Sequence, residues 1–218
     1  MSGPPRVEIL VTQPFQQNTL LVALADSDRC IVLDPGFGPQ KIIAAIEKRG
    51  WTPEAILLTH GHIDHIAGNE GLRQRWPEIP ILIGTGDAPM LTDAKLNLSA
   101  PYGMELVSPP ADRLLSEGEK LTVAGLEFEV RLIPGHSPGH IVYVYHAAEP
   151  KFVLGGDVLF QGSIGRTDFP GGSQQLLVDG IRKKLFTLPN DTVVFPGHGD
   201  PTTVGEERET NPFCGSRA

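Results

Sequence analysis

Short apolar runs separated by glycine- and proline-rich segments recur along the chain, and this pattern predicts strands joined by tight turns. One such run, Ala55-Ile56-Leu57-Leu58, follows Thr52-Pro53 and indicates a buried strand. Further strands are expected between Leu114 and Val130, around a turn at Ala124-Gly125. The other predicted strands are Val7 to Thr12, Asn18 to Leu24, Cys30 to Asp34, Ile79 to Ile83, Ile141 to Tyr145, Phe152 to Leu154 and Thr192 to Phe195.

Helical spacing of apolar residues appears between these strands. Ile42, Ile43 and Ile46 predict a helix that Gly50 ends. Residues 97–110 contain three prolines and a glycine, so a long loop is expected there. The predicted helices are Pro39 to Arg49, Ile66 to about Trp76, Asp87 to Leu91 and Ser173 to Leu188. Two strand-rich blocks with helices and no linker predict one domain over residues 1–218, with two packed sheets, helices outside and a short C-terminal tail.

A weak internal repeat supports two similar halves. Residues 31–36, Ile-Val-Leu-Asp-Pro-Gly, resemble residues 152–157, Phe-Val-Leu-Gly-Gly-Asp. Likewise Leu57-Leu58-Thr59-His60 resembles residues 194–198, if one extra residue is allowed. We therefore expect a structural duplication, with the functional site where the two halves meet.

The most unusual stretch is Thr59-His60-Gly61-His62-Ile63-Asp64-His65, between the strand at 55–58 and the next helix. His60 and His62 can point to the same side, whereas the adjacent Asp64 and His65 are expected to diverge. Such a set suits two neighbouring metal ions better than one, and imidazole and carboxylate ligands favour zinc or iron-type divalent ions. The alternative is a solvated histidine-rich turn.

Three more polar residues stand in a similar local setting. His136, Asp157 and His198 each follow a short apolar run and lie beside glycine, so each is expected on a tight loop at a strand end. Strand ends are where ligands gather in layered α/β folds. Singly, each histidine could be a surface group and Asp157 a turn residue; their joint occurrence with the first cluster favours a common metal site.

These residues resemble the marker of the metallo-β-lactamase superfamily, a His-x-His-x-Asp-His turn followed by a separate His, Asp and His, and all seven positions are filled. The resemblance covers about Val7 to Pro212. Residues 132–140 and 156–160 look like glyoxalase II-type thioester hydrolases, and Gly165-Arg166-Thr167-Asp168-Phe169-Pro170 matches the short form of that group.

The resemblance implies an αββα four-layer sandwich with two divalent metal ions, zinc being expected and iron or manganese also suiting the ligands. One ion would take His60, His62 and His136, and the other Asp64, His65 and His198, with Asp157 bridging them. His140 is expected to support a ligand or the backbone rather than bind metal, and His146 to lie on the surface.

The expected function is a metal-dependent hydrolase in which a metal-bound hydroxide cleaves a small thioester, an S-acylglutathione such as S-lactoylglutathione. Asp64 and Asp157 would orient the hydroxide, and a thiolate leaves with little acid help. Arg166 is the substrate-binding candidate, through a carboxylate of the substrate; the alternative is an ion pair with Asp168 or Glu117. The chain ends soon after His198, so its affinity for glutathione is expected to be modest.

Two other functions stay open. Mononuclear-iron persulfide dioxygenases share the fold, and their sequences look similar at residues 165–168 and 206–209. A metal-stabilised, non-catalytic binding module is the second alternative, although structural zinc sites are usually rich in cysteine. β-Lactamase activity is less expected, because nothing indicates export.

Composition narrows the partners and the location. The formal net charge is −8 and there is no basic tract, which argues against nucleic acid. No segment has the length of a membrane span, and the first residues lack a signal-peptide-like run, so a cytoplasmic protein is expected. The only cysteines, Cys30 and Cys214, are expected to be reduced, the first in the core and the second exposed near the end. The oligomeric state is not predicted.

Overall fold

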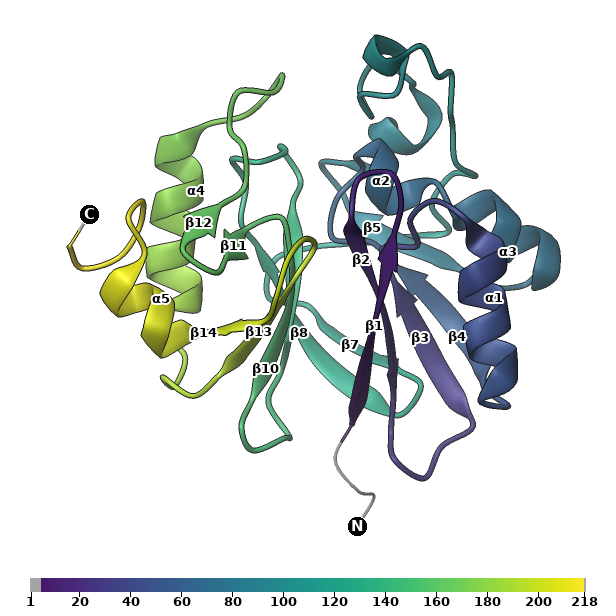
Figure 1. The fold of residues 1–218 in the computed structure, drawn as a ribbon, viewed down its shortest axis with the longest axis horizontal. Coiled ribbons are helices and arrows are strands. Elements are labelled where there is room, and N and C mark those ends of the chain that lie inside the picture. Colours follow the sequence, from purple (N-terminus) through teal and green to yellow (C-terminus); the bar gives the residue numbers. More distant parts are fainter. Residues whose placement is uncertain (1–4, 218) are drawn as a thin grey trace.

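Two β-sheets pack face to face, with helices on both outer sides, in the computed structural model, which describes residues 5–217 (Figure 1). The expected αββα four-layer arrangement is confirmed. The first sheet has the strand order β1-β2-β3-β4-β5-β6. Its strands are β1 Arg6–Thr12, β2 Gln17–Ala23, β3 Arg29–Leu33, β4 Thr52–Leu57, β5 Ile81–Gly84 and β6 Arg113–Leu115.

The second sheet has the order β14-β13-β10-β9-β8-β7. Its strands are β7 Lys120–Val123, β8 Leu126–Leu132, β9 Ile141–Tyr145, β10 Phe152–Gly156, β13 Val193–Pro196 and β14 Thr202–Thr203. A separate hairpin of β11 Leu159–Phe160 and β12 Ser163–Ile164 follows β10 directly. Because β10 carries Asp157 at its end, this hairpin lies next to the predicted metal ligands.

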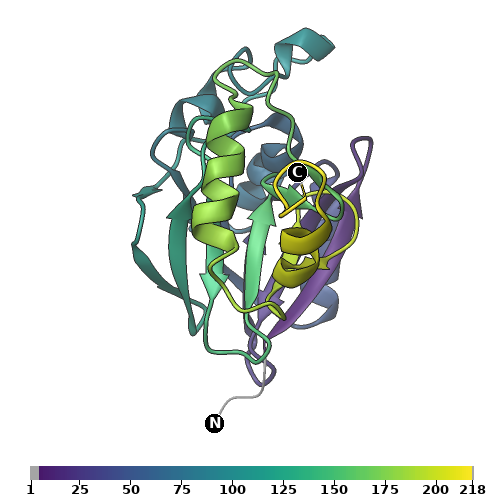
Figure 2. The same cartoon turned by 90° about the vertical axis from the view of Figure 1, so that its left-hand side faces the viewer.

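The helices cover the outer faces of the sheets. Helices α1 Pro39–Lys48 and α3 Asn69–Arg75 lie on the first sheet, and α4 Gln174–Gly180 lies along the second beside α5 Val204–Thr210 (Figure 2). The remaining helical turns are α2 Ile63–Ile66, the 3₁₀ turns Ala88–Thr92 and Ala100–Tyr102, and a π-helical turn Ile181–Leu185 that continues α4. Among the described residues, no helix combines the length and apolar content needed to cross a bilayer.

Alternation along the strands divides the apolar side chains into three layers. Leu20 and Val22 of β2 face the space between the sheets, where they join Phe128 and Tyr143 of the second sheet. The intervening residues face outward, and both outer layers are covered by the apolar stripes of the helices. Residues of β2 are therefore buried on both faces.

The strand order agrees with the expected duplication. In the first half, β1, β2 and β3 form an antiparallel meander, and β4 pairs parallel to β3 after helix α1. In the second half, β8, β9 and β10 form the same meander, and β13 pairs parallel to β10 after helix α4. The histidine turn after β4 thus corresponds in topology to His198 after β13.

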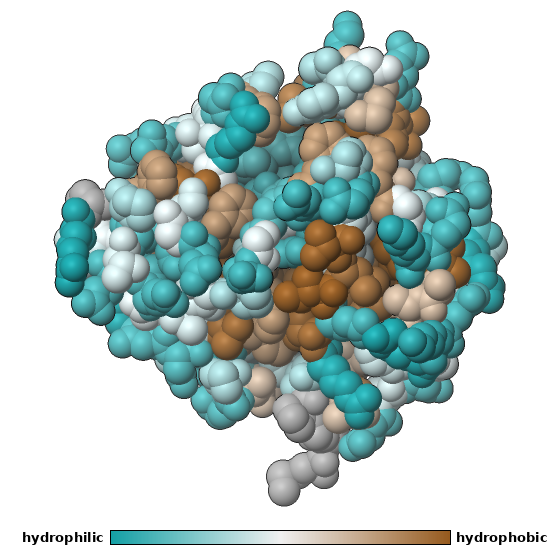
Figure 3. Space-filling view, viewed as in Figure 1, coloured by the Kyte–Doolittle hydropathy of each residue, from teal (hydrophilic) through white to brown (hydrophobic). Residues whose placement is uncertain are grey.

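The sandwich is open on the side that faces the viewer in Figure 1. There β1 is an edge strand that pairs only with β2 within residues 5–217. Figure 3 shows an apolar area over this strand. Val11, on the same strand, is 57% exposed. A cavity of about 240 Å³ lined by Val7, Phe152 and Phe195 marks the same opening between the sheets.

The predicted helix from Ile66 to Trp76 is wrong in its boundaries, because the chain forms α2, a break at Ala67-Gly68, and then α3. Gly68 donates a backbone hydrogen bond to Pro35 O at 2.8 Å. A Cβ at Gly68 would lie 2.7 Å from Gly36 O, so only glycine permits this approach. The contact joins the end of β3 to the histidine turn.

The prediction that Cys214 is exposed is also wrong. Its side chain is 1% exposed and packs with the layer under α4, and burial raises the pKa of its thiol to about 12. Arg182 donates from Nε to Cys214 O at 2.9 Å, which holds the end of the chain against the helix. Cys30 is buried, as predicted, and His146 is exposed, as predicted.

Tyr143→Phe tests the contact between the sheets. The fully buried Tyr143 hydroxyl donates to Leu58 O at 2.9 Å, just before the histidine turn. Removing it leaves a buried carbonyl without that partner, so the free energy of unfolding should fall by about 1–2 kcal/mol in denaturant titrations. Tyr145→Phe on the same strand is the matched control, since its hydroxyl forms no hydrogen bond with a described residue, and an equal loss there would contradict the assignment.

Candidate metal centre

The seven predicted metal-binding residues come together at one end of the sandwich, where several strands end. His60, His62, Asp64 and His65 lie on the turn after β4 and on α2. The loop between β8 and β9 brings His136. Asp157 follows β10, and His198 follows β13.

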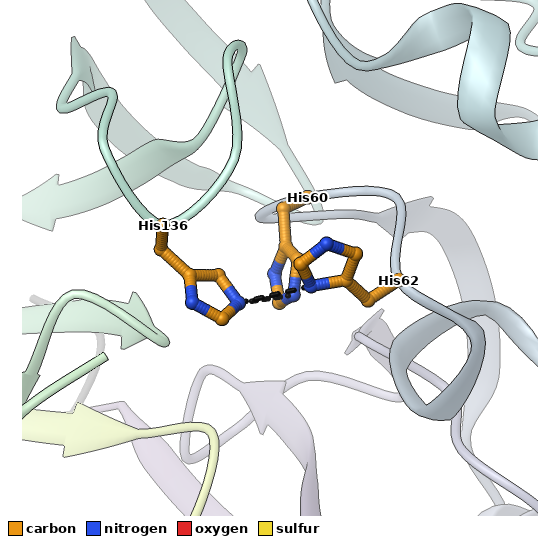
Figure 4. Close-up of side chains that lie close together, drawn as sticks. All are labelled: His60, His62 and His136. Atoms are coloured by element: carbon orange, nitrogen blue, oxygen red, sulfur yellow. Dashed lines mark hydrogen bonds between the residues drawn. The ribbon is translucent and has the colours of Figure 1, made fainter. Parts of the chain in front are cut away.

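Three histidines form the first group. His136 Nε2 lies 2.9 Å from His62 Nδ1 and 3.3 Å from His60 Nε2, and all three rings are buried (Figure 4). Ligands of one tetrahedral ion, each about 2.0–2.1 Å from the metal, lie roughly 3.4 Å from one another. The spacing of these nitrogens is therefore close to that of three ligands of one ion.

Asp64, His65 and His198 form the second group. Asp64 Oδ2 lies 3.2 Å from His198 Nε2 and 3.6 Å from His65 Nε2. The expectation that Asp64 and His65 diverge is wrong, because neighbours in one helical turn are rotated by only about 100° and an imidazole is long enough to reach back. The two adjacent side chains converge on one place.

Asp157 lies between the two groups. Its Oδ1 is 3.5 Å from His65 Nε2, while its Oδ2 is 3.5 Å from His136 Nε2 and 3.6 Å from His198 Nε2. A Cβ at Gly197 would lie 2.2 Å from Asp157 Oδ1, so the absence of a side chain there makes room for the carboxylate. One carboxylate thus faces histidines of both groups.

The residues present fit a pair of divalent cations. His65 Nε2 and Asp157 Oδ1 are both buried and have no hydrogen-bond partner, although both point toward the middle of the cluster. Buried polar atoms without a partner are costly, and a bound cation would satisfy both of them. The donor set of nitrogens and carboxylate oxygens without thiolate is one that zinc, iron and manganese accept.

A further carboxylate, Asp34, orients this cluster. Asp34 accepts hydrogen bonds from Thr59 N at 2.7 Å and Thr59 Oγ1 at 2.6 Å, and it lies 2.9 Å from His65 Nδ1. The bond to Nδ1 leaves Nε2 of His65 directed at the cluster. Sequence analysis missed this role, although Asp34 directly follows β3 as Asp157 directly follows β10.

Asp87 joins the loops of the two halves. It accepts from Ser137 Oγ at 2.5 Å, Gly139 N at 2.6 Å and Gly61 N at 3.2 Å, in the two loops that carry His136 and the first histidine cluster. Burial raises the pKa of Asp87, and these bonds oppose the rise. The sequence showed Asp87 only as the start of a short helix, so its long-range partners were not predictable.

Two more buried side chains hold ligand loops in place. Asn18 Nδ2 donates to Pro196 O at 3.1 Å and Gly199 O at 2.7 Å, on either side of His198. His140 Nε2 accepts from the backbone N–H of Asp157 at 3.0 Å, which matches the supporting role expected for it. Burial lowers the pKa of His140, consistent with a neutral ring that accepts this bond.

Charge is distributed unequally over the cluster. Burial lowers the pKa of His60 and of His62, so these rings are neutral near pH 7. For His65, burial acts in the same direction, but Asp64, Asp157 and Asp34 outweigh it and raise the pKa to about 10. Burial opposes ionisation of Asp64, yet His65 and His198 hold its pKa below the usual range. The second group thus combines an ionised Asp64 with a His65 ring that carries a proton near pH 7.

A pocket of about 370 Å³ opens over the cluster. Its floor includes His62, Asp64, His136, Asp157 and His198. Its remaining lining residues are Phe15, Ile63, Leu98, Tyr102, Phe160, Ser163, Ile164, Arg166 and Phe169. A molecule bound there would touch the metal ligands directly.

Arg166 lies at the rim of this pocket and is already paired. Its Nε and Nη2 donate to the two carboxylate oxygens of Asp168 at 2.9 and 2.7 Å, and its guanidinium lies 4.2 Å from the centre of the Phe169 ring. Of the two ion pairs considered from the sequence, the one with Asp168 is present, while Glu117 pairs with Lys184. Both side chains of the Arg166–Asp168 pair are largely exposed, which leaves Arg166 within reach of a ligand.

The expected C-terminal tail forms helix α5 and supports the pocket wall. Glu207 is 1% exposed and accepts from Thr202 Oγ1 at 2.7 Å, Gly162 N at 3.0 Å and Asn211 Nδ2 at 2.7 Å. Asn211 Nδ2 also donates to Ser163 O at 3.0 Å. The hairpin β11–β12 is therefore held from behind by the end of the chain.

A family profile described as the metallo-beta-lactamase superfamily matches residues 12–198. The chain belongs to this superfamily. Its superfamily and its relatives place it among metal-dependent hydrolases in the broad sense. The names of its relatives agree on this broad class but not on a substrate.

Two curated relatives illustrate the range of names. The probable metallo-hydrolase YqgX of Bacillus subtilis is 42% identical over 92% of this chain and 93% of its own length. The hydroxyacylglutathione hydrolase GloC of Haemophilus influenzae is 36% identical over 97% of this chain and 99% of its own length.

Solved structures of the superfamily agree with the fold. The B3 metallo-β-lactamase BLEG-1 superposes with a TM-score of 0.91 at 37% identity, covering 96% of this chain and 99% of its own. A di-iron-bound form of TTHA1623 has a TM-score of 0.83 at 38% identity, covering 95% and 100%. The metal ions in this second structure are two irons.

His198→Ala tests the two-group arrangement. The geometry predicts two tightly bound ions per chain, and removing His198 should reduce them to one, since it deletes one corner of the second group only. Metal content would be measured by mass spectrometry after dialysis against metal-free buffer. His146→Ala, a surface histidine, is the control, and two retained ions in the His198 variant would contradict the arrangement.

Proton release on metal loading tests the charge distribution. With a pKa of about 10, the His65 ring carries a proton at pH 6, and a metal ion binds only the neutral ring. Loading the metal-free protein with zinc should therefore release at least one proton, and affinity should rise with pH up to about 10. Calorimetry in buffers of different ionisation enthalpy measures the number of protons released. The measurement is made at pH 6 because a metal-bound water, with a pKa near 7, largely keeps its own proton there. Loading without proton release would contradict the raised pKa.

Proposed function

We propose that this protein is a two-metal thioesterase that hydrolyses a small S-acyl thiol, an S-acylglutathione such as S-lactoylglutathione. The observation that carries the proposal is the pair of ligand groups around Asp157, on the floor of a pocket of about 370 Å³. The similarity to a hydroxyacylglutathione hydrolase over nearly the full length of both chains supports the substrate class.

In this proposal each group holds one ion. His60, His62 and His136 would hold the first, and Asp64, His65 and His198 the second. Asp157 would contribute to both, in keeping with its distances to His65 and His136. We infer zinc, iron or manganese from the ligand types, in keeping with the di-iron form of a structure 38% identical to this chain.

Two bound divalent ions would supply a hydroxide at neutral pH and offset the negative charge that develops on the thioester oxygen. Asp64 and Asp157 line the pocket floor, so their oxygens would orient the attacking hydroxide by accepting its hydrogen bond. His62 and His136, also on the pocket floor, keep the reacting carbonyl beside the first group. The departing thiolate needs no proton donor, and no other nucleophile is required.

Arg166 is proposed to contact a carboxylate on the thiol part of the substrate. It lies at the pocket rim, and its exposed guanidinium keeps free donors beside those that Asp168 uses. Because Asp168 already offsets its charge, the contact adds modest affinity.

Two other reactions on this fold are alternatives. A β-lactam also has a carbonyl that hydroxide attacks, and the 37% identity to BLEG-1 favours this alternative beyond the fold alone. A mononuclear-iron dioxygenase would need only one metal group, so the close approach of Asp64, His65 and His198 favours the two-metal hydrolase.

Oxygen-independent hydrolysis of S-lactoylglutathione by the metal-loaded protein is the expected result. His60→Ala should lower kcat/KM by more than about a hundredfold, since loss of even a residue that supports a ligand costs 10–100-fold. His146→Ala should be unaffected. Thioester absorbance would be followed with and without oxygen, alongside a chromogenic cephalosporin and oxygen uptake with glutathione persulfide.

The outcomes separate the candidates. Faster cleavage of the cephalosporin than of any thioester would make the protein a β-lactamase, and persulfide-dependent oxygen uptake would make it a dioxygenase. Absence of all three activities from protein that holds two metal ions would favour a binding module.

A further inference from the structure

The walls of the pocket are apolar to a degree that the metal chemistry does not require. Above the ligands, its large side chains are Phe15, Leu98, Tyr102, Phe160, Ile164 and Phe169. We propose that this pocket selects substrates by their acyl group, and that it takes thioesters of aliphatic or aromatic acyl groups in preference to lactoyl thioesters. The inference rests on the proposed thioesterase function and specifies its substrate class.

Aromatic rings border both metal groups. The Phe169 ring lies 5.2 Å from His62 and 6.0 Å from His136, measured between ring centres. On the other side, the Phe160 ring lies 6.2 Å from that of His198. A carbonyl that reaches the metal ligands therefore has apolar surface beside it on either side.

A second wall stands farther from the ligands. Phe15, in the turn between β1 and β2, packs edge-on against Tyr102 with ring centres 5.5 Å apart. Tyr102 comes from a segment more than eighty residues later and is 56% exposed, an unusual position for a large ring. When a ligand covers apolar surface that is exposed to water at the mouth of a pocket, the removal of that surface from water contributes favourably to the binding free energy.

Charge in the pocket does not match the thiol part of a glutathione thioester. Glutathione carries two carboxylates and one ammonium group, whereas Arg166 is the one lysine or arginine among the described residues that line the pocket. Two of its nitrogens, Nε and Nη2, already donate hydrogen bonds to Asp168 at 2.9 and 2.7 Å. The thiol part therefore finds few charged partners.

Size points in the same direction. A volume of about 370 Å³ is at the low end for small-molecule pockets, which span roughly 300–1,000 Å³. The pocket can surround an acyl group and the thioester while the thiol part extends toward solvent. A lactoyl group is short and carries a hydroxyl, so it would leave much of the apolar wall uncovered.

The test compares acyl chains and thiols independently in the metal-loaded protein. Acetyl, lactoyl, butanoyl, hexanoyl and phenylacetyl thioesters would be assayed on glutathione and on N-acetylcysteamine, which lacks the charges. We expect kcat/KM to rise about two- to fourfold for each added methylene from acetyl to hexanoyl, since burying one is worth about 0.8 kcal/mol. Hexanoyl esters of the two thiols should differ by less than about tenfold.

Variants locate the effect. Tyr102→Ala removes the exposed wall and should flatten the rise of kcat/KM with chain length. Leu96→Ala is the matched control, because Leu96 is 44% exposed on the same segment and does not line the pocket. Phe160→Leu provides a second wall variant that keeps the site apolar and should lower the phenylacetyl rate most.

Each outcome bears on one level of the argument. A flat series, a faster lactoyl than hexanoyl thioester, or an equal slope in Tyr102→Ala would overturn the acyl selection while leaving the thioesterase intact. Strong preference for glutathione over N-acetylcysteamine at every chain length would overturn it as well. No hydrolysis of any thioester above the His60→Ala background would overturn the proposed function, and this inference with it.

Discussion

The molecule is arranged around the high cost of burying carboxylates and imidazoles together in a place that excludes water. For Asp34 and Asp87, protein donors offset that cost, because each carboxylate lies within hydrogen-bond distance of three donor atoms of neighbouring loops. Asp157 and His65 do not, because each keeps a buried atom without a partner. The difference separates groups that fix the loops from groups left open for a cation.

The site is also the main junction between the two halves of the chain. Ligands come from both sheets, and the bonds of Asp87 and Asn18 run from the first half to the second. Because each half supplies part of each ligand group, neither half has a complete site. The ligand groups therefore depend on the packing of the two inner sheet faces, and a substitution that separates the sheets is expected to disturb the ligands as well.

Local pattern was enough to find most of the strands and helices and the seven candidate ligands, because the ligands lie on turns shortly after apolar runs. It was not enough for Asp34, Asp87 and Asn18, whose side-chain partners lie 25 or more residues away and leave no mark on the neighbouring sequence. The break at Gly68 and the burial of Cys214 were missed for the same reason. Each depends on contact with a distant segment, β3 for Gly68 and α4 for Cys214.

The position of His198 near the C-terminus has a consequence for how the protein is made. Asp64 and His65 emerge from the ribosome early, but the group they belong to stays incomplete until β13 has been synthesised and has paired with β10. All three histidines of the first group lie at or before His136. A nascent chain therefore contains these three histidines before Asp157 and His198 have been made, but it lacks the strands β10 and β13 that complete the site.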